Sequence, residues 1–169
     1  MRDNPMVVIR LTKSLQKELK LQPQKVDISN PFFSWHANMF LLRRRKCIVL
    51  MNDLSRLSLT LHGIKSSQYK NLHEIFQSEL REYLTSEGIE ERMVTAYLDH
   101  CTNLVVSNTD NRSVIGTLNE IMFTMNAVEK DDRYESNTER NQWNNQIIYK
   151  PIDYNKPIDV FKSELVKYV

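Results

Sequence analysis

The chain has 169 residues, of which 41% are hydrophobic and 26% are charged; this is the balance of one ordinary globular domain and excludes a disordered or low-complexity chain. No apolar stretch approaches the roughly 20 residues of a membrane helix, and the first residues lack the apolar core of a signal peptide, so we expect a cytoplasmic protein without membrane contact. The net charge is only +2, but residues 1–70 hold 13 Lys and Arg against 4 Asp and Glu, whereas residues 71–169 hold 10 against 17.

The first third of the chain predicts four strands and one helix. Residues 6–11 are a short β-type run, and Thr12 is a candidate N-cap for a helix that follows it. After a loop over residues 23–34, three strands come in a row. The predicted helix covers residues 13–21, and the three strands cover residues 35–42, 46–51 and 57–62. Short turns between successive strands favour an antiparallel meander.

The apolar pattern within the meander distinguishes its strands. Leu57, Leu59 and Leu61 alternate with polar residues, which indicates a strand buried on one face only. Residues 47–51 are apolar without interruption, which is typical of a central strand buried on both faces.

Helical spacing then replaces the strand pattern. Apolar residues recur at helical spacing over residues 69–84, 90–101 and 113–128, and residues 104–107 form one further strand. Gly88 is a suitable C′ residue for the first of these helices. We therefore expect an α+β fold, with an antiparallel sheet of about four to five strands, helices packed on it, and the order β-α-β-β-β-α-α-β-α.

The composition changes after residue 128, which predicts a compact domain over residues 1–128 and a C-terminal extension over residues 129–169. Residues 130–145 are rich in charged residues and Asn, which indicates an exposed or partly disordered connector. Residues 146–149 are a candidate short strand, and residues 158–168 a final helix. The extension either packs as an addition to the domain or holds a partner.

The first segment with chemical potential lies at the start of the second strand. Alternation places His36 and Asn38 on one face of that strand and Trp35 on the other. Imidazole titrates near neutrality, so His36 is a candidate ligand contact or general base. The alternative is structural, with Trp35 in the core and both polar side chains bonded to backbone.

The second segment is the start of the helix over residues 113–128. Asn111 or Asp110 is the expected N-cap, and free N–H groups at a helix start suit an anion. Arg112, Gly116 and Asn119 fall on one face at spacings of four and three residues. Gly116 costs about 1 kcal/mol relative to Ala, which implies the close approach of a backbone or a ligand. The alternative is a buried network around the Trp35 segment.

The third segment is a basic hairpin tip formed by Arg43, Arg44, Arg45 and Lys46. Four adjacent cations suit a polyanion such as a nucleic-acid backbone. The alternative is that they are simply solvated and that they discourage edge aggregation.

Other chemistry finds no support in the sequence. His62, His73 and His100 lack the spacing of metal ligands, so we expect no metal and no cofactor. Cys47 and Cys101 both lie in apolar runs, which indicates buried thiols in a reducing compartment.

Four motifs resemble a family of uncharacterised bacterial proteins that carry a domain of unknown function. The matching stretches are Thr12-Lys13, residues 34–40 (Ser-Trp-His-Ala-Asn-Met-Phe), residues 44–53 (Arg-Arg-Lys-Cys-Ile-Val-Leu-Met-Asn-Asp) and residues 111–120 (Asn-Arg-Ser-Val-Ile-Gly-Thr-Leu-Asn-Glu). The resemblance covers about residues 6–128. The resemblance implies a compact cytoplasmic α+β domain, and it weakly favours a setting in phage, plasmid or defence biology. It implies no activity.

Three functions are compatible with these features. The first is a non-enzymatic binding or regulatory module that contacts another protein, with Trp35, His36, Asn38, Arg112 and Asn119 as candidate ligand or anion contacts. The second is a nucleic-acid-binding protein that uses residues 43–46. The third is a metal-independent enzyme acting on a nucleotide or RNA, with His36 as acid or base and Arg112 as a phosphate clamp.

Overall fold

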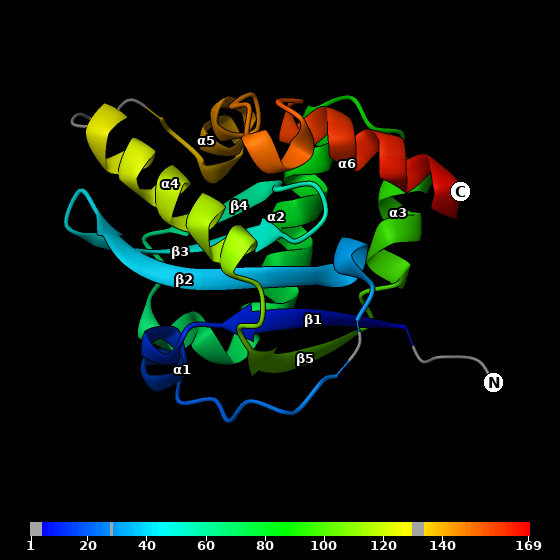
Figure 1. The fold of residues 1–169 in the computed structure, drawn as a ribbon. Coiled ribbons are helices and arrows are strands. Elements are labelled where there is room, and N and C mark those ends of the chain that lie inside the picture. The colour runs from blue at the N-terminus through cyan, green and yellow to red at the C-terminus, as the bar shows by residue number, and fades with distance from the viewer. Residues whose placement is uncertain (1–4, 28, 130–133) are drawn as a thin grey trace.

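The computed structural model describes residues 5–27, 29–129 and 134–169 and contains one five-stranded sheet with helices packed around it (Figure 1). The strands are β1 (Met6–Leu11), β2 (Ser34–Leu42), β3 (Arg45–Asn52), β4 (Ser58–His62) and β5 (Asn103–Asn108). The helices are α1 (Lys13–Leu19), α2 (Leu72–Ser86), α3 (Glu91–Asp99), α4 (Arg112–Val128), α5 (Asn137–Asn144) and α6 (Pro157–Leu165). The predicted α+β class and the predicted order of elements as far as α4 are confirmed.

The sheet is mixed, with the strand order β4-β3-β2-β1-β5. Strands β2, β3 and β4 form the predicted antiparallel meander, because tight turns join them. Strand β1 instead runs parallel to both of its neighbours, β2 and β5. Parallel pairing requires a crossover connection, which α1 and the loop after it provide between β1 and β2. The sheet therefore combines two antiparallel and two parallel pairs.

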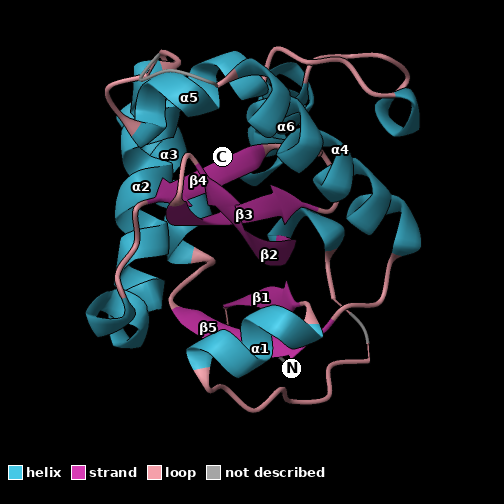
Figure 2. Ribbon diagram, turned by 90° about the vertical axis from the view of Figure 1, so that its left-hand side faces the viewer, coloured by secondary structure: helices cyan, strands magenta, loops and turns pink. Residues whose placement is uncertain are grey.

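Two apolar cores lie on the two faces of the sheet. Figure 2 places α2 and α3 on one side of the strands and α4 on the other. The larger core contains residues of α1, α2, α3 and α6 together with Trp35 of β2. The smaller core joins α4 to β3, with Leu118 and Val49 among its buried residues. As predicted, β3 is buried on both faces from Cys47 onward.

Two predicted N-caps are confirmed. The Thr12 hydroxyl accepts a hydrogen bond from the backbone N–H of Leu15, and the Asn111 side chain accepts bonds from the N–H groups of Ser113 and Val114. These bonds satisfy donors that have no partner inside the helix. Helix α1 ends at residue 19 and not at the predicted residue 21, because Lys20 adopts a left-handed conformation with a φ of 55°.

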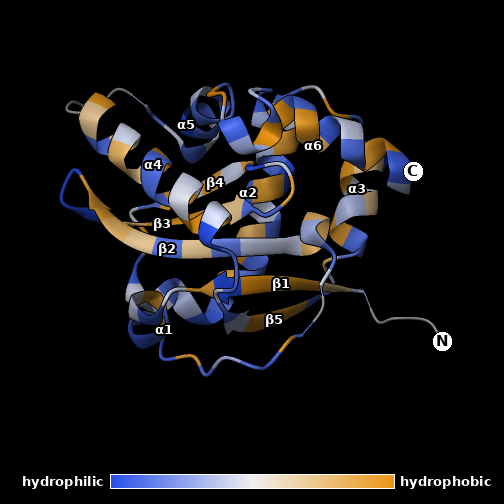
Figure 3. Cartoon of the chain, viewed as in Figure 1, coloured by the Kyte–Doolittle hydropathy of each residue, from blue (hydrophilic) through white to orange (hydrophobic). Residues whose placement is uncertain are grey.

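The prediction of an exposed or partly disordered connector is wrong for residues 137–145, because residues 137–144 form α5 and pack on the sheet. Residues 130–133 of the predicted connector lie outside the described residues. Figure 3 shows α5 as a hydrophilic helix that lies beside β4. Asn137, Asn141 and Asn145 lie four residues apart and therefore on one side of the helix. Their side-chain oxygens accept the backbone N–H groups of His62, Thr60 and Ser58, at 3.0, 3.0 and 2.8 Å.

This asparagine ladder (Asn137, Asn141, Asn145) closes the edge of β4. The three backbone donors would otherwise remain available to another strand. The hydroxyls of Ser58 and Thr60 also donate to the ladder, which explains why this polar side of β4 is buried and not solvent-exposed as the alternation predicted.

A buried ion pair ties the end of α4 to α5. The Arg140 Nε donates to both carboxylate oxygens of Glu129, at 2.9 and 3.0 Å, and both side chains are 2% exposed. A buried ion pair is tolerated when its remaining donors are also satisfied, and Arg140 donates further to Asn137.

The last part of the chain shares the larger core. The predicted final helix is confirmed as α6, followed by a 3-10 turn over Val166–Tyr168. Its residues Ile158, Phe161 and Leu165 are buried in the larger core. The predicted strand over residues 146–149 is wrong, because these residues leave α5 through a turn and an irregular segment while α5 already occupies the β4 edge. The boundary at residue 128 stays a prediction.

Among the described residues, none of the helices combines the length and the apolar character that spanning a membrane requires.

Replacing an asparagine of the ladder should destabilise the protein more than replacing an exposed asparagine elsewhere. Asn141→Ala removes the acceptor of both the Thr60 N–H and its hydroxyl, so we expect the free energy of unfolding to fall by about 1–3 kcal/mol. Asn126→Ala, at an exposed position of α4, is the control and should change it by less than about 0.5 kcal/mol. Urea denaturation measures both. Equal midpoints for the two variants would mean that the ladder contributes nothing to stability.

The two cysteines should behave as protected thiols. Both are fully buried by the protein, and burial raises the pKa of Cys47 to about 12 and the pKa of Cys101 to about 12. Because the thiolate is the reactive species, neither should react with DTNB at pH 8 in the native protein, and both should react in urea. Rapid labelling of the native protein would contradict this burial.

Candidate functional site

His36 is the centre of a buried polar network that joins three segments of the chain. Its ring lies at the start of β2 and is fully buried. The Nδ1 atom lies 2.7 Å from an oxygen of Asp53, in the turn after β3. The Nε2 atom accepts the backbone N–H of Asp110, in the loop between β5 and α4, at 3.2 Å.

The second ring nitrogen has one further contact with the same loop. The Nε2 atom also lies 3.3 Å from a carboxylate oxygen of Asp110. Both ring nitrogens therefore have partners within the fold. Asp53 is itself held by its backbone, whose N–H donates to the Ser34 carbonyl at 2.9 Å.

Two buried arginines surround this network. Arg10 of β1 lies 3.3 Å from the Asp110 carboxylate and also donates to the Asn108 carbonyl. Arg56, which has a φ of 63°, donates to the Asp53 carbonyl and, at 2.9 Å, to the hydroxyl of Ser113 in α4. Burial lowers the pKa of Arg56, and the Asp53 carboxylate opposes that shift.

The same residues bring together a group of potential metal ligands. Donor atoms of His36, Asp53 and Asp110 all lie within 4.8 Å of one another. The lone pair of Nε2 is already engaged by an N–H donor, and Arg10 already neutralises Asp110. The arrangement therefore favours a self-contained hydrogen-bonded lock that fixes the start of α4. We refer to His36, Asp53, Asp110 and Arg10 as the histidine lock.

Sequence reasoning identified His36 but missed its partners. The sequence indicates Asp110 only as a candidate N-cap and Asp53 only as the last residue of a motif. It gives Arg10 no role, although Arg10 is the single charge within the apolar run of β1. A charged residue inside a buried strand needs a partner, so Arg10 was the available signal.

The candidates at the start of β2 do not meet in one cleft. Trp35 points into the larger core, where its Nε1 donates to the Tyr97 hydroxyl at 3.0 Å. The Asn38 oxygen accepts bonds from the Thr12 hydroxyl at 2.7 Å and from the Met39 N–H at 2.8 Å. His36 belongs to the separate lock. The three side chains therefore serve three different local networks.

The three histidines that the sequence did not favour as metal ligands each contact a backbone carbonyl. The ring nitrogens of His62, His73 and His100 lie 2.8, 2.8 and 3.1 Å from the carbonyl oxygens of Leu42, Cys101 and Ala96.

Arg112 and Asn119 lie on the exposed side of α4, and Gly116 lies between them. Apart from its two chain neighbours and the backbone of α4 itself, no described atom lies within 4 Å of a Cβ atom added at Gly116. The neighbouring backbone approach that the sequence suggested is therefore not made by the described part of this chain. The space beside Gly116 opens instead into a groove.

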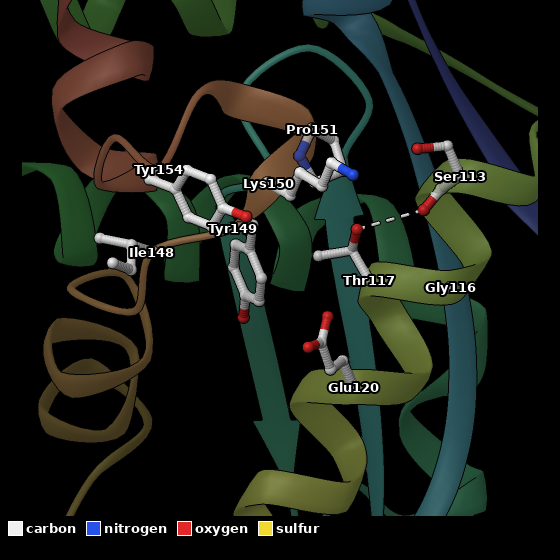
Figure 4. Close-up of a pocket in the computed structure, with 9 residues that line it drawn as sticks. All are labelled: Ser113, Gly116, Thr117, Glu120, Ile148, Tyr149, Lys150, Pro151 and Tyr154. Atoms are coloured by element: carbon white, nitrogen blue, oxygen red, sulfur yellow. Dashed lines mark hydrogen bonds between the residues drawn. The ribbon is translucent and has the colours of Figure 1, made fainter.

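This groove of about 500 Å³ lies between α4 and residues 148–154, and we call it the α4 groove (Figure 4). Its α4 wall is formed by Ser113, Gly116, Thr117 and Glu120, and its other wall by Ile148, Tyr149, Lys150, Pro151 and Tyr154. In Figure 4 the amino group of Lys150 extends toward α4, and the Tyr149 ring lies beside Glu120. Burial, with a smaller contribution from Glu120, raises the pKa of Tyr149.

The backbone of the second wall is strained. Asp153 and Tyr154 both adopt left-handed conformations, with φ values of 54° and 58°. The Tyr154 N–H donates to the Tyr149 carbonyl at 2.9 Å, which closes the turn. The ring of Tyr154 is nevertheless 60% exposed at the groove. Strained residues of this kind concentrate at ligand sites.

The predicted basic hairpin exists and is a two-residue turn. Arg43 and Arg44 occupy its two central positions, and Arg45 begins β3 opposite Leu42. Arg44, Arg45 and Lys46 are exposed, whereas Arg43 is half-buried.

Comparison with known proteins identifies a family and no characterised relative. A family model described as a domain of unknown function (DUF6933) matches residues 8–160, which extends past the motifs into α6. No curated protein and no solved structure matches the chain.

The histidine lock predicts a structural effect at a distance from His36. His36→Leu leaves the Asp53 carboxylate and the Asp110 N–H without their partner, so we expect the free energy of unfolding to fall by about 1–3 kcal/mol. The amide of Asp110 should also exchange with deuterium faster, because its hydrogen bond is lost. Urea denaturation and amide exchange by NMR measure the two effects. Unchanged exchange at Asp110 would show that the lock does not hold this loop.

Proposed function

The chain belongs to the family of the domain of unknown function DUF6933, and from the geometry of its surface we propose that it is a non-enzymatic binding module that holds a peptide segment of a partner protein in the α4 groove. The proposal retains the cytoplasmic location and the phage, plasmid or defence setting that the motifs imply.

Gly116 is the observation that carries this proposal. A glycine inside an exposed helix costs about 1 kcal/mol relative to alanine. Its backbone is helical, so no left-handed conformation requires glycine, and no described atom outside the backbone of α4 and its two neighbours approaches its missing side chain. Nothing within the fold therefore requires glycine at this position. A molecule that approaches α4 from outside, through the space that the absent side chain leaves open, explains it.

The walls of the groove suit a peptide. A peptide backbone presents both N–H donors and carbonyl acceptors, and the groove offers the Glu120 carboxylate on one wall and the Lys150 ammonium on the other. Ile148 and Tyr154 are 53% and 60% exposed, which provides apolar and aromatic contacts for side chains of the peptide. Tyrosine is enriched at the centres of protein interfaces because it combines a large apolar ring with a polar tip.

The predicted ligand contacts Arg112 and Asn119 fit the proposal as rim residues. Both are exposed on α4 and adjoin the groove residues Ser113 and Glu120 in sequence. Charged and amide side chains around a partly apolar centre are the ordinary arrangement of a binding surface. Trp35, His36 and Asn38 contribute indirectly, by holding β2 and the start of α4.

The enzymatic alternative has weaker support. General acid or base catalysis requires a group within hydrogen-bond reach of the substrate. The ring of His36 is fully buried, and both of its nitrogens already bond Asp53 and Asp110.

Gly116 gives a direct test of an external role. Gly116→Ala should raise the free energy of unfolding by about 0.5–1 kcal/mol, since nothing in the described chain needs the glycine. Thermal unfolding measures the change, which corresponds to a rise in Tm of roughly 1–4 °C for a domain of this size. A destabilised variant would mean that the glycine has an internal role, and the main support for the groove would be lost.

Peptide binding is tested by selecting phage-displayed random peptides on the wild-type protein and measuring labelled peptides by fluorescence anisotropy. We expect Gly116→Gln to weaken binding at least about tenfold, because its side chain would enter the groove; loss of one well-packed contact is worth about 1.4 kcal/mol or more. Tyr154→Ala should act in the same direction.

The matched control for this experiment is Ala127→Gln, which introduces the same side chain at an exposed position of α4 outside the groove lining. It should leave peptide affinity unchanged. Failure to select any peptide, or equal affinities for Gly116→Gln and Ala127→Gln, would overturn the proposed function.

A further inference from the structure

We propose that a second, separate surface of this protein binds the phosphate backbone of nucleic acid. We call it the basic surface, and its seven cations are Lys17, Lys20, Arg44, Arg45, Lys46, Lys65 and Lys70. All seven side chains are exposed.

Specific contacts bring the three elements of this surface together. The Glu18 carboxylate of α1 accepts bonds from the Lys46 ammonium, at the start of β3, and from the Tyr69 hydroxyl at 2.8 Å, in the 3-10 helix η2 (Ser66–Asn71). The Arg45 guanidinium packs against Gly63, just before η2, where an added Cβ would collide with it. Figures 1 and 2 agree in placing the hairpin tip and α1 at the same end of the molecule.

The charge of this surface is nearly unopposed. Glu18 is the acidic residue at its centre, and the hydrogen bonds from Lys46 and Tyr69 already engage it and lower its pKa. By contrast, residues 71–169 carry the excess of Asp and Glu. The protein therefore presents a positive end, which would attract a polyanion and raise its rate of association.

The hairpin tip carries its arginines at a conformational cost. Arg43 and Arg44 have φ values of 50° and 68°, the left-handed values that both central positions of a tight hairpin require. Asn-Gly satisfies this geometry with little strain, whereas arginine does so only at a cost in free energy. Arg44 is exposed at the tip, and the conformation of the turn does not favour arginine there. Its positive charge is therefore the property that accounts for arginine at this position.

A hollow extends the basic surface along α1. It has a volume of about 400 Å³ and is lined by Lys13, Gln16, Lys17, Lys20, Leu21, Gln22 and Pro23. Lys13 and Lys17 lie one turn apart on the same side of α1, and Lys20 follows as the left-handed residue that caps the helix. Three ammonium groups beside two amides form a recess suited to successive phosphates.

Nucleic acid fits this surface better than an anionic membrane. Between Lys65 and Lys70, η2 exposes the side chains of Ser66, Ser67 and Gln68, which are the hydroxyl and amide groups that commonly bond phosphate and sugar. Arginine at the tip can bond a phosphate through two N–H groups. Membrane surfaces are bound instead by amphipathic helices with a large apolar face, and the exposed side of η2 is polar.

The test is fluorescence anisotropy with labelled single-stranded DNA, double-stranded DNA and single-stranded RNA, over a range of salt concentrations. We expect an affinity that falls steeply with salt. The double variant Lys17→Gln with Lys20→Gln should weaken binding and reduce the slope of log affinity against log salt by about 1 for each lost phosphate contact. The three nucleic acids distinguish which of them is the ligand.

A matched control and one informative turn variant make this test specific. Lys156→Gln with Lys167→Gln removes the same charge at exposed positions of the C-terminal region and should leave the affinity and the salt slope unchanged. Arg44→Gly relieves the strained turn, so it should maintain or increase stability to urea while weakening nucleic-acid binding. Gly116→Gln, which blocks the α4 groove, should not alter nucleic-acid binding, so the two proposals fail independently.

Three results would overturn the inference: no binding to any of the three nucleic acids at low salt, equal losses for the two lysine pairs, or binding to vesicles of phosphatidylserine and phosphatidylcholine without binding to nucleic acid.

Discussion

One buried imidazole determines how the start of α4 is held against the sheet. His36 has no contact with solvent, and burying a polar ring is unfavourable unless its bonds are made. Its two nitrogens therefore require Asp53 and the Asp110 backbone at fixed positions, which ties the meander to the loop before α4. The direction of α4, and with it one wall of the α4 groove, follows from this requirement. In the binding function proposed above, the histidine lock holds this wall in place and does not itself contact the ligand.

The rest of the groove depends on the end of the chain. Residues 148–154 leave α5 after its bonds to β4, and α6 then anchors the chain in the larger core. The second wall therefore lies between two anchored helices, α5 and α6. Its strained turn at Asp153 and Tyr154 is held at both ends by these helices. The basic surface lies on other elements, α1, the hairpin and η2. The molecule consequently separates a groove of mixed polarity from a cationic end.

Local signals in the sequence predicted most of the elements, and distant contacts explain the errors. Thr12 and Asn111 act within one turn of their own helices, so their cap roles could be recognised. Alternation placed Trp35 and His36 on opposite faces of β2 correctly. It failed for Thr60, which is polar and yet buried, because Asn141 covers it from 81 positions further along the chain. The parallel pairing of β1 and the partners of His36 are likewise set by segments far apart in sequence, which no local periodicity encodes.

The asparagine ladder also sets a limit on its own length. Four residues advance a helix by about 6.0 Å, whereas two residues advance an antiparallel strand by about 6.8 Å. The two repeats are nearly commensurate, and they drift apart by roughly 0.8 Å with each rung. Three rungs stay in register within hydrogen-bond tolerance, and a fourth would be misplaced by more than 2 Å by this estimate. The side chains of a helix can thus bond the backbone of a neighbouring strand over a few residues only. Strand β4, with five residues, is short enough for all three rungs to form.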